Sequence, residues 1–390
     1  MHASTLAPFS FRTIPNLVCE PGATAHLPAL VAHHFPLVCR LLIVSSPDIG
    51  QCALLAPAVR ALKDAGMSVE MFSEVRSRPT EAVILRATAE ARRREIEIVV
   101  GWGDGSAMDV AKLVASLALN EQDLATAYGV NKLSGPRLPL IQIPTTAGSS
   151  AEAMPFVAVA MDEAADKTIV SPALYADLVI LDARLTSNHF PKATAADGIG
   201  AMARAIEAYA APQKKNPLSD MLASQALRFL SAHILTACRD NTNLVAKQAM
   251  QLGGLLAGQS FANAPSPTMQ ALAAPVTGIF QVPESLARAL VLAHVLRFNA
   301  SSARAQYAEL AEIVAPGASG SEEARVEALI ARLAGIALET GIETRLREVG
   351  VGESDLDRLA DAALLQMLEL QYGPSLLTRA DARAIYAAAL

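Results

Sequence analysis

The stretch that decides the fold is Val99-Val100-Gly101-Trp102-Gly103-Asp104-Gly105-Ser106-Ala107-Met108-Asp109. An apolar, β-branched run passes into a glycine-rich turn, and a segment with helical character follows. Glycines let a bound group approach the backbone closely, and the first turn of a helix offers free N–H donors and a partial positive charge. Ser106 is placed to cap that helix. The stretch therefore predicts a strand, a phosphate-binding turn and a helix, although the same arrangement also occurs in α/β folds that bind no phosphate.

Strand-like and helix-like segments alternate on both sides of this turn. The strand candidates are Leu41–Val44, Val69–Phe72, Ile96–Val100, Leu138–Ile143 and Leu178–Leu181, and the helix candidates are Ala53–Ala65, Glu81–Arg94 and Ala107–Leu119. Alternation at this spacing predicts parallel strands joined by crossover helices. Two further apolar runs, between residues 156 and 170, flank Asp162–Asp166, which predicts a hairpin turn.

The strand signal fades after residue 185. Helical spacing is found in Ala195–Ala210, Leu218–Leu235, Leu244–Gly258, Leu286–Asn299, Ser321–Thr340 and Asp355–Leu370, and Asn216-Pro217 is a typical helix start. The length of 390 residues suggests two domains if a domain has roughly 150 residues. We therefore predict an α/β domain over residues 1–185 and an all-helical domain over residues 186–390.

Composition excludes several classes of protein. Apolar residues make up 52% of the chain, which is ample for a buried core, and the net charge of −6 without a basic stripe argues against a nucleic-acid partner. No apolar run reaches the ~18 residues of a membrane helix. The N-terminus lacks a signal-peptide pattern, and the four cysteines are scattered without a CxxC motif. We expect a cytoplasmic protein with reduced thiols, no membrane contact and a small-molecule substrate.

Several motifs along the chain resemble those of iron-containing (group III) alcohol dehydrogenases. Residues 103–112 (GDGSAMDVAK) resemble the family's GGGSxxDxxK segment, and residues 144–152 (PTTAGSSAE) resemble its PTTAGTGSE loop. Further likenesses are Lys167 through Ser171-Pro172 to a KxxxxSP segment, and residues 205–209 (AIEAY), 216–220 (NPLSD) and 295–299 (VLRFN) to helices of the second domain. Because these likenesses extend over nearly the whole chain with compatible spacing, chance is an unsatisfactory explanation.

The resemblance implies a fold and a cofactor. The fold would be a Rossmann-like dinucleotide-binding domain followed by a helical domain, as in dehydroquinate synthase and the iron-containing alcohol dehydrogenases, with NAD or NADP in the cleft between them. Lys167 would lie near the nicotinamide and the substrate. A homodimer or larger homo-oligomer is implied as well. The residues carried over to the cofactor site are Ser46, Gly103, Asp104, Gly105, Ser106, Asp109, Thr145, Thr146 and Ser149.

Three departures bear on cofactor binding. Asp104 replaces the middle glycine of the first motif, and a carboxylate beside a pyrophosphate is repulsive unless it points away or meets the ribose hydroxyls. Ser150-Ala151 replaces Gly-Ser in the second loop and could crowd the cofactor. Ser45-Ser46 stands where an acidic residue would follow the first strand, and without that carboxylate NADP is as plausible as NAD.

The positions of the family's metal ligands differ most from the family pattern. Family members hold iron or zinc with one aspartate and three histidines, and the metal polarises the substrate oxygen. The corresponding positions hold Gly200, Arg204, Gln270 and Glu284, and a further family histidine corresponds to Ala274. None of the seven histidines pairs with another at HxxxH spacing. We therefore expect no catalytic metal.

Arg204 and Glu284 bring opposite charges to these positions, which leaves three readings open. The two side chains could pair and fill an abandoned cavity, since buried ion pairs are commonly structural. Arg204 could instead stand in for the metal and bind a carboxylate or another oxyanion, together with Lys167. A weak oxygen-rich metal site at Glu284 and Gln270 is the least favoured reading, because Arg204 would repel the cation.

Two functions follow from this pattern. The first is an NAD(P)-dependent dehydrogenase or reductase that acts on a small alcohol, aldehyde, ketone or oxo acid without the metal, with Lys167, Arg204 and Glu284 as candidate catalytic residues. The alternative is an inactive or repurposed homologue that keeps the fold, with or without nucleotide binding. Asp104 and the replaced ligands favour the alternative.

Overall fold

The structure, a computed structural model, describes residues 8–50, 55–161, 166–367 and 373–390. Its N-terminal half is built on a six-stranded, all-parallel sheet with the order β1-β9-β6-β4-β2-β3. The strands are β1 (Leu17–Cys19), β2 (Arg40–Val44), β3 (Ser68–Phe72), β4 (Ile98–Gly103), β6 (Leu140–Pro144) and β9 (Leu178–Leu181). The predicted parallel strands are thus confirmed, and β1 is an additional edge strand that pairs with β9.

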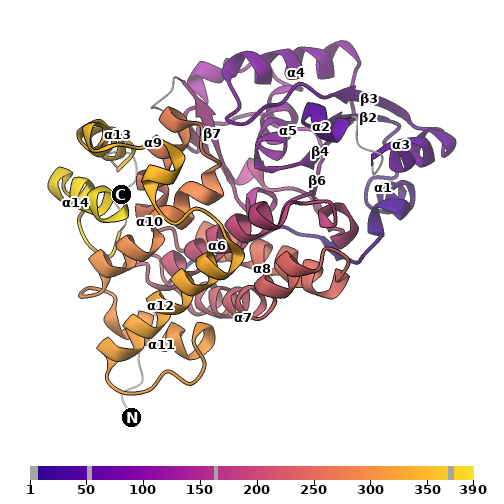
Figure 1. Cartoon of the computed structure of the whole chain (residues 1–390). Coiled ribbons are helices and arrows are strands. Elements are labelled where there is room, and N and C mark those ends of the chain that lie inside the picture. Colours follow the sequence, from indigo (N-terminus) through magenta and orange to yellow (C-terminus); the bar gives the residue numbers. More distant parts are fainter. Residues whose placement is uncertain (1–7, 51–54, 162–165, 368–372) are drawn as a thin grey trace.

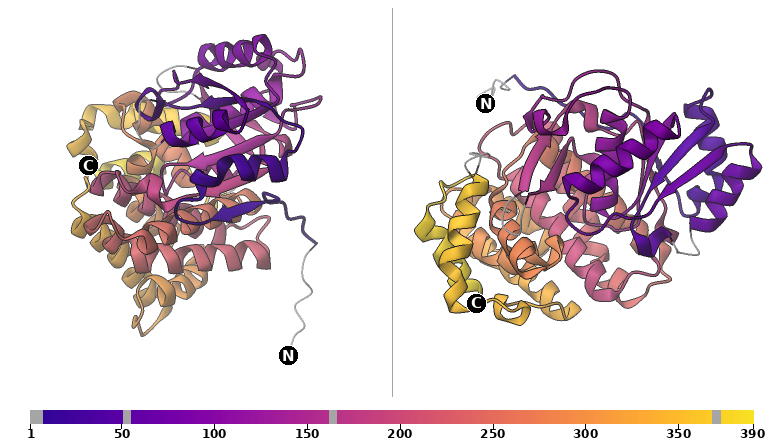
Figure 2. Two further views of the ribbon diagram at one scale, coloured as in Figure 1. Left: turned by 90° about the vertical axis from the view of Figure 1, so that its right-hand side faces the viewer. Right: turned by 90° about the horizontal axis from the view of Figure 1, so that it is seen from above.

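Helices cover both faces of this sheet (Figures 1 and 2). Successive residues of a strand point to opposite faces, so Leu41 and Ile43 pack on one side while Leu42 and Val44 pack on the other. The helices of this half are α1 (Leu27–His34), α2 (Pro47–Gly50), α3 (Leu55–Asp64), α4 (Glu81–Arg93) and α5 (Gly105–Leu117). Strands buried on both faces need apolar residues throughout, which explains the continuous apolar run at the end of β2.

A small second sheet lies beside the main one, with the order β5-β8-β7. Its strands are β5 (Gly129–Val130), β7 (Phe156–Ala160) and β8 (Asp166–Val170). The pair β7 and β8 is antiparallel, as the hairpin prediction requires. The predicted turn itself, at residues 162–165, lies outside the described residues, as do residues 1–7, 51–54 and 368–372, which include parts of two predicted helices and Cys52.

From residue 191 onward, the described chain is helical. Its helices are α6 (Pro191–Tyr209), α7 (Pro217–Arg239), α8 (Leu244–Asn263), α9 (Thr268–Phe280), α10 (Glu284–Asn299), α11 (Arg304–Val314), α12 (Glu322–Thr340), α13 (Leu356–Met367) and α14 (Arg379–Ala389). They share one large apolar core, separate from the two cores that flank the sheet. No helix in the described part of the chain is both long enough and apolar enough to cross a membrane.

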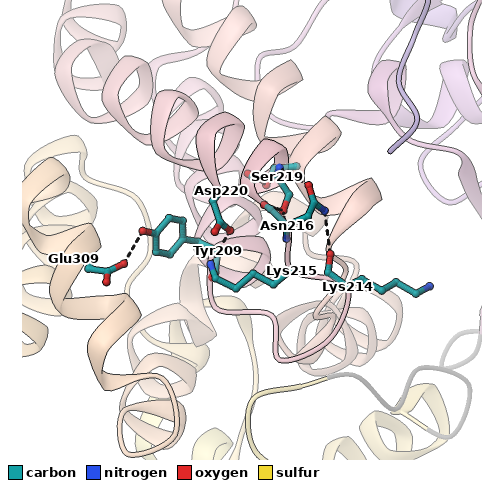
Figure 3. Close-up of polar contacts among 8 residues, drawn as sticks. Tyr209, Lys214, Lys215, Asn216, Ser219, Asp220 and Glu309 are labelled. Carbon is teal, nitrogen blue, oxygen red and sulfur yellow. Dashed lines mark hydrogen bonds and ion pairs between the residues drawn. The ribbon is translucent and has the colours of Figure 1, made fainter. Parts of the chain in front are cut away.

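Helix α6 carries the side chains that matter most below, and its C-terminal end is fixed by polar contacts (Figure 3). Asn216 caps α7 by accepting a hydrogen bond from the Ser219 backbone at 3.0 Å, and Ser219 reciprocates, so the helix start that the sequence predicts is confirmed. The Tyr209 hydroxyl at the end of α6 donates to Glu309 of α11 at 2.6 Å. The Tyr209–Glu309 bond joins α6 to α11, and Lys215 joins α6 to α7 by donating to the Tyr209 carbonyl and to Asp220.

Candidate active site at the interface of the two halves

A cleft of about 700 Å³ lies between the sheet and the helical half. Its walls come from the β4–α5 turn and the loop after β6 on one side, and from α6, α9 and the start of α10 on the other. The chain passes from β2 outward to β3 and then returns to β4 on the other side of β2. Ligands of open α/β sheets bind at the carboxyl ends of strands beside such a switch in strand order. The cleft therefore occupies the expected ligand-binding position.

Asp104 shapes the phosphate-binding turn. It is the N-cap of α5, and its Oδ1 accepts a hydrogen bond from the Ala107 backbone at 3.0 Å. The prediction that Ser106 caps this helix is wrong, because the Asp104 carboxylate takes that role and α5 begins at Gly105. Burial raises the pKa of Asp104 above its ordinary value. A carboxylate thus occupies the helix N-terminus, where the resemblance implies a pyrophosphate.

The loop after β6 supplies the neighbouring wall. The Thr145 backbone donates to the Gly103 carbonyl at 2.9 Å, which joins the two loops. Thr146 lines the cleft, and its buried hydroxyl has no hydrogen-bond partner among the described residues. A buried hydroxyl without a partner is costly, so Thr146 fits the polar edge of a bound dinucleotide. Ser149 also lines this wall.

Most of the predicted cofactor residues meet at this wall. Those that line the cleft are Asp104, Gly105, Ser106, Asp109, Thr146 and Ser149. Gly103 and Thr145 lie directly behind them through their shared backbone contact. Ser46 is half-buried just after β2 and is not among the described residues that line the cleft. The resemblance therefore placed these residues together, with Ser46 at the periphery.

Asp109 is paired with the buried Lys112, the last residue of the 103–112 segment, to which the sequence alone assigned no role. The Lys112 ammonium donates to Asp109 at 2.9 Å and to the Phe156 carbonyl at 3.1 Å. Burial raises the pKa of Asp109 to about 6 despite this pairing. Because Phe156 begins β7, Lys112 joins α5 to the small sheet under the cleft. The i, i+3 spacing on one helix was the signal that could have identified the pair.

Ser150 adopts an unusual backbone conformation. Its φ is +55°, in the left-handed region where the resembled family has glycine. That conformation costs roughly 1–2 kcal/mol for a residue with a side chain. The Ser150 hydroxyl donates to the Gly254 carbonyl at 2.7 Å, so the side chain faces α8. The prediction that Ser150 crowds the cofactor is therefore wrong, whereas Ala151 does line the cleft.

Arg204 crosses from α6 to this loop. Its Nη1 donates to the Gly148 carbonyl at 2.5 Å and lies 3.4 Å from the Ser150 hydroxyl. The side chain is only 5% exposed, yet it lines the cleft, and its Nε has no hydrogen-bond partner among the described residues. Burial of the side chain is the main cause that lowers the pKa of Arg204 to about 9, and the positive charge of the nearby Arg288 is the second. The guanidinium is therefore held rigidly, and its positive charge is only partly neutralised by its neighbours.

The predicted pairing of Arg204 with Glu284 is a loose one. Arg204 Nη2 lies 3.9 Å from Glu284 Oε1, which is within ion-pair range but too long for a hydrogen bond. Glu284 instead accepts a hydrogen bond from Arg288, one turn further along α10. Arg288 lowers the pKa of Glu284, and Arg204 adds to that effect. Sequence reasoning missed Arg288, although its i, i+4 spacing from Glu284 was available.

Three of the four positions that the resemblance assigns to metal ligands line one cleft, but their chemistry does not suit a cation. Arg204, Gln270 and Glu284 line the same cleft, while a Cβ added to Gly200 would lie 3.4 Å from Ser285. One carboxylate and one amide are few ligands for a divalent ion, and a guanidinium 3.9 Å from that carboxylate opposes one. Within the described ranges, no three His, Cys, Asp or Glu side chains are grouped so that they could hold a metal.

The structure does not bring Lys167 into the cleft. Lys167 is exposed, and its ammonium lies 5.3 Å from the centre of the Tyr128 ring. Side chains alternate along β8, so the preceding residue Asp166 lines the cleft and Lys167 does not. The expectation that Lys167 lies near the substrate is therefore wrong for this chain.

Sequence reasoning also missed a polar group on the helical wall. Asp197, Ser285 and His189 all line the cleft. Burial raises the pKa of the Asp197 carboxyl, and the Ser285 backbone lies close to Gly200, three residues further along α6. Asp197 precedes Gly200 by three residues and Arg204 by seven, so helical periodicity could have placed it on the same face of α6.

Two buried carboxyl groups lie near enough to Arg204 to influence its charge. Glu207 accepts a hydrogen bond from the Met269 backbone at 2.7 Å, and burial raises its pKa to about 8. Burial raises the pKa of Glu152 to about 7. Both carboxyls therefore tend to hold a proton near neutral pH, which leaves more of the Arg204 charge uncompensated.

Comparison with known proteins identifies the family. The sequence profile described as iron-containing alcohol dehydrogenase matches residues 15–183, and the one described as the C-terminal part of the Fe-containing alcohol dehydrogenase family matches residues 194–390. The chain belongs to the iron-containing alcohol dehydrogenase family. Its members are oxidoreductases, so the resemblance drawn from the motifs is confirmed.

Individual relatives support the same placement. The chain is 32% identical to long-chain-alcohol dehydrogenase 1 of Geobacillus thermodenitrificans over 355 residues, which covers 90% of this chain and 89% of that protein. A crystal structure of 1,3-propanediol oxidoreductase superimposes with a TM-score of 0.93 at 27% identity and covers 98% of this chain and all of that one. Sulfoacetaldehyde reductase of Bifidobacterium kashiwanohense, solved in complex with NAD⁺, has the same fold, with a TM-score of 0.85 at 22% identity and coverage of 98% of each chain.

Proposed function

We propose that this protein is an NAD(P)-dependent dehydrogenase or reductase that acts on a small alcohol, aldehyde, ketone or oxo acid without a catalytic metal. The observation that carries the proposal is the position of Arg204. Its buried guanidinium replaces a family metal ligand and lines the same cleft as the cofactor loops. A fixed positive charge there can stabilise negative charge on a substrate oxygen, which is the role of the metal in related enzymes.

The cofactor would be held by the first wall of the cleft. Gly105, Ser106 and Ser149 offer close backbone approach and hydroxyl groups, and the unpartnered Thr146 hydroxyl supplies a further donor or acceptor. A bound nicotinamide would supply or accept the hydride. The sulfoacetaldehyde reductase of the same fold was solved with NAD⁺, which supports this class of cofactor. Ser46 follows β2 without an acidic side chain to repel a 2′-phosphate, so NADP is as acceptable as NAD.

Arg204 would act by charge and orientation. It is fixed at Gly148 and Ser150, so little reorganisation is needed when a substrate oxygen develops negative charge. Its pKa of about 9 still leaves it protonated at neutral pH. The relatives named above act on alcohols and aldehydes by their names, which supports a carbonyl carbon as the centre that receives the hydride.

One observation favours a second candidate function, a homologue that keeps the fold but not the turnover. The Asp104 carboxylate caps α5 and occupies the backbone donors that a pyrophosphate would use. Weak or absent dinucleotide binding would follow if that carboxylate stayed ionised and in place.

Fluorescence titration of the purified protein with NADH and with NADPH separates the candidates. We expect saturable binding of at least one of them, followed by its oxidation when acetaldehyde, propanal, octanal or glyoxylate is added. Binding without oxidation by any of these carbonyl compounds would favour the inactive homologue. If neither dinucleotide binds, the proposed function is wrong.

A further inference from the structure

One edge of the Arg204 guanidinium makes no hydrogen bond within the described part of the chain. Nη1 donates to the Gly148 carbonyl and lies within reach of the Ser150 hydroxyl, so this nitrogen is taken up by the loop after β6. Nε is buried without a partner, and Nη2 has only the loose contact with Glu284 at 3.9 Å. The N–H bonds of Nε and Nη2 point in the same direction, so this edge can donate two parallel hydrogen bonds to one ligand.

Arg288 explains why Glu284 does not bind this edge. Its Nη2 donates to Glu284 Oε1, the same oxygen that lies 3.9 Å from Arg204. The Arg288 side chain is 2% exposed, and its Nε and Nη1 have no partner among the residues that the structure describes, so Glu284 is the one acceptor that it reaches there. A buried guanidinium that loses its acceptor is strongly destabilised, which holds Glu284 at Arg288. Two guanidinium groups thus share one carboxylate, and Arg204 keeps most of its charge for a ligand.

Helix α9 faces Arg204 across the cleft with polar but uncharged groups. Gln270, Ala274, Thr277 and Gln281 recur at helical spacing and all line the cleft, and α9 contains no acidic residue. The Thr277 hydroxyl is buried without a hydrogen-bond partner among the described residues. Ala274 adds only a methyl group between Gln270 and Thr277, which leaves room for a small ligand. This wall can therefore accommodate an anion without repelling it.

We propose that the substrate is a short 2-oxo acid, which the Nε–Nη2 edge of Arg204 binds through its carboxylate and the adjacent carbonyl oxygen, and that Arg288 keeps this edge accessible by holding Glu284. The inference rests on the proposed function, because it names the substrate class of that reaction. In a 2-oxo acid, one carboxylate oxygen and the carbonyl oxygen can lie on the same side and accept two parallel hydrogen bonds. A simple aldehyde offers one acceptor and no charge.

The reaction converts the 2-oxo acid to a 2-hydroxy acid. Hydride from the reduced nicotinamide forms a C–H bond at the carbonyl carbon, the π electrons of the C=O bond move to oxygen, and a proton from water completes the O–H bond. The products are the 2-hydroxy acid and the oxidised nicotinamide. Arg204 stays protonated, and its contact with the carbonyl oxygen strengthens as negative charge develops there. Arg204 is thus the catalytic residue, and Arg288 is a positioning residue that acts through Glu284.

Matched substrates test the substrate class. Pyruvate is compared with pyruvamide, in which a neutral amide replaces the carboxylate, and glyoxylate with acetaldehyde. We expect kcat/KM to be about a hundredfold or more higher for the acid in at least one pair, because a site built for a charged group rejects the analogue that lacks it. Arg204→Met should abolish this preference. Lys192→Ala is the control, since Lys192 is another cation of the cleft but is exposed and paired with Glu343 at 2.7 Å. It should leave the preference within about twofold of wild type.

A rescue experiment tests the positioning role of Arg288. Arg288→Met releases Glu284, which can then pair with Arg204 and compete with the substrate carboxylate, so KM for the acid should rise by about tenfold or more. Adding Glu284→Gln to that variant should restore KM, because a neutral amide competes poorly for a guanidinium. A purely structural role of Arg288 predicts no such rescue, and failure of the double variant to recover KM would overturn this part of the proposal.

Binding of oxamate supplies a readout that does not depend on turnover. Oxamate has the shape and charge of pyruvate but accepts no hydride. Calorimetric titration of the NADH- or NADPH-saturated protein should show saturable oxamate binding. Arg204→Met should weaken that binding by about tenfold or more, and Lys192→Ala should leave it unchanged. Equal affinity of wild type and Arg204→Met for oxamate would overturn the assignment of the carboxylate to Arg204.

The outcomes distinguish this proposal from the proposed function. If wild type reduces acetaldehyde or pyruvamide as well as the matching acid, the substrate class is wrong and the proposed function stands. Wild-type protein that binds neither dinucleotide, or reduces no carbonyl compound, would overturn both.

Discussion

The two walls of the cleft have diverged from the family pattern to different degrees. The sheet-side wall keeps the glycine turn and the threonines of the second loop, with Asp104 and Ser150 as its main changes. On the helical wall, Arg204 and Glu284 stand at positions that the motif resemblance assigns to metal ligands. Under the proposed function, this difference means that the protein still binds a dinucleotide but no longer needs a metal.

Arg204 offers the largest expected effect and the most direct way to break this comparison. Arg204→Met keeps the aliphatic stem but removes the donors to Gly148 and Ser150. If the charge replaces the metal, turnover should fall by at least about a hundredfold, as for the loss of a donor that stabilises an oxyanion. Steady-state kinetics with NADH and the best aldehyde measure the change. Arg204→Lys is the matched control and should recover part of the rate, whereas full turnover in Arg204→Met would remove Arg204 from the chemistry.

Asp104 tests the sheet-side wall. Asp104→Gly restores the family residue and frees the α5 N-terminal amides from the Asp104 carboxylate. We expect NADH to bind about tenfold more tightly, which corresponds to about 1.4 kcal/mol, while α5 loses only a few tenths of a kcal/mol because glycine is also tolerated at an N-cap. Fluorescence titration measures the affinity. Asp104→Asn should give a smaller gain because it removes the charge but keeps the cap, and unchanged affinity in both variants would show that the carboxylate does not oppose the cofactor.

Glu207 tests the buried charge of the helical wall through pH. Its pKa rises from 4.5 to about 8 on folding, mainly because burial disfavours the carboxylate. Between these values the folded protein holds a proton that the unfolded chain has released, so this group lowers the free energy of unfolding as pH rises through that window. Glu207→Gln should therefore stabilise the protein at alkaline pH by at least about 1 kcal/mol and have little effect in acid. Urea unfolding of wild type and Glu207→Gln at acidic and at alkaline pH checks this prediction. An equal change in the free energy of unfolding at both would contradict it.

Ser150 has the smallest expected effect. Ser150→Gly relieves the left-handed backbone strain but removes the hydrogen bond to Gly254 and a contact of Arg204. Strain and hydrogen bond are each worth about 1 kcal/mol, so the free energy of unfolding should change by less than about 1 kcal/mol. Chemical denaturation measures the net change in the free energy of unfolding. A loss above about 2 kcal/mol would show that the serine, and with it the placement of Arg204, matters more to the fold than the contacts suggest.

Periodicity predicted the sheet-side half well because parallel strands buried on both faces give unbroken apolar runs that glycine turns separate. It missed α9, which contains Pro275, a residue that ordinarily ends a helix. The motifs placed Arg204, Gln270 and Glu284 in one cleft correctly. They could not show that Arg288, rather than Arg204, is the hydrogen-bond partner of Glu284, because the choice between two nearby cations depends on side-chain conformation.

The errors at Lys167 and Ser106 have local causes. One residue of register along β8 decides whether Lys167 or Asp166 faces the cleft. At the start of α5, Asp104 competes with Ser106 for the cap and prevails, since it directly precedes the first helical residue. Asp197 and Ser285 line the same cleft only because α6 packs against α10, and no local sequence pattern predicts that packing.

Metal dependence is the most direct test of the central claim, that turnover in this cleft relies on Arg204 instead of a metal ion. Purified enzyme is dialysed against EDTA, analysed for metals, and assayed for NADH- or NADPH-dependent aldehyde reduction before and after addition of Fe²⁺ or Zn²⁺. The account predicts turnover that is unchanged by dialysis and by either metal. Turnover that is lost on chelation and restored by Fe²⁺ or Zn²⁺ would contradict it.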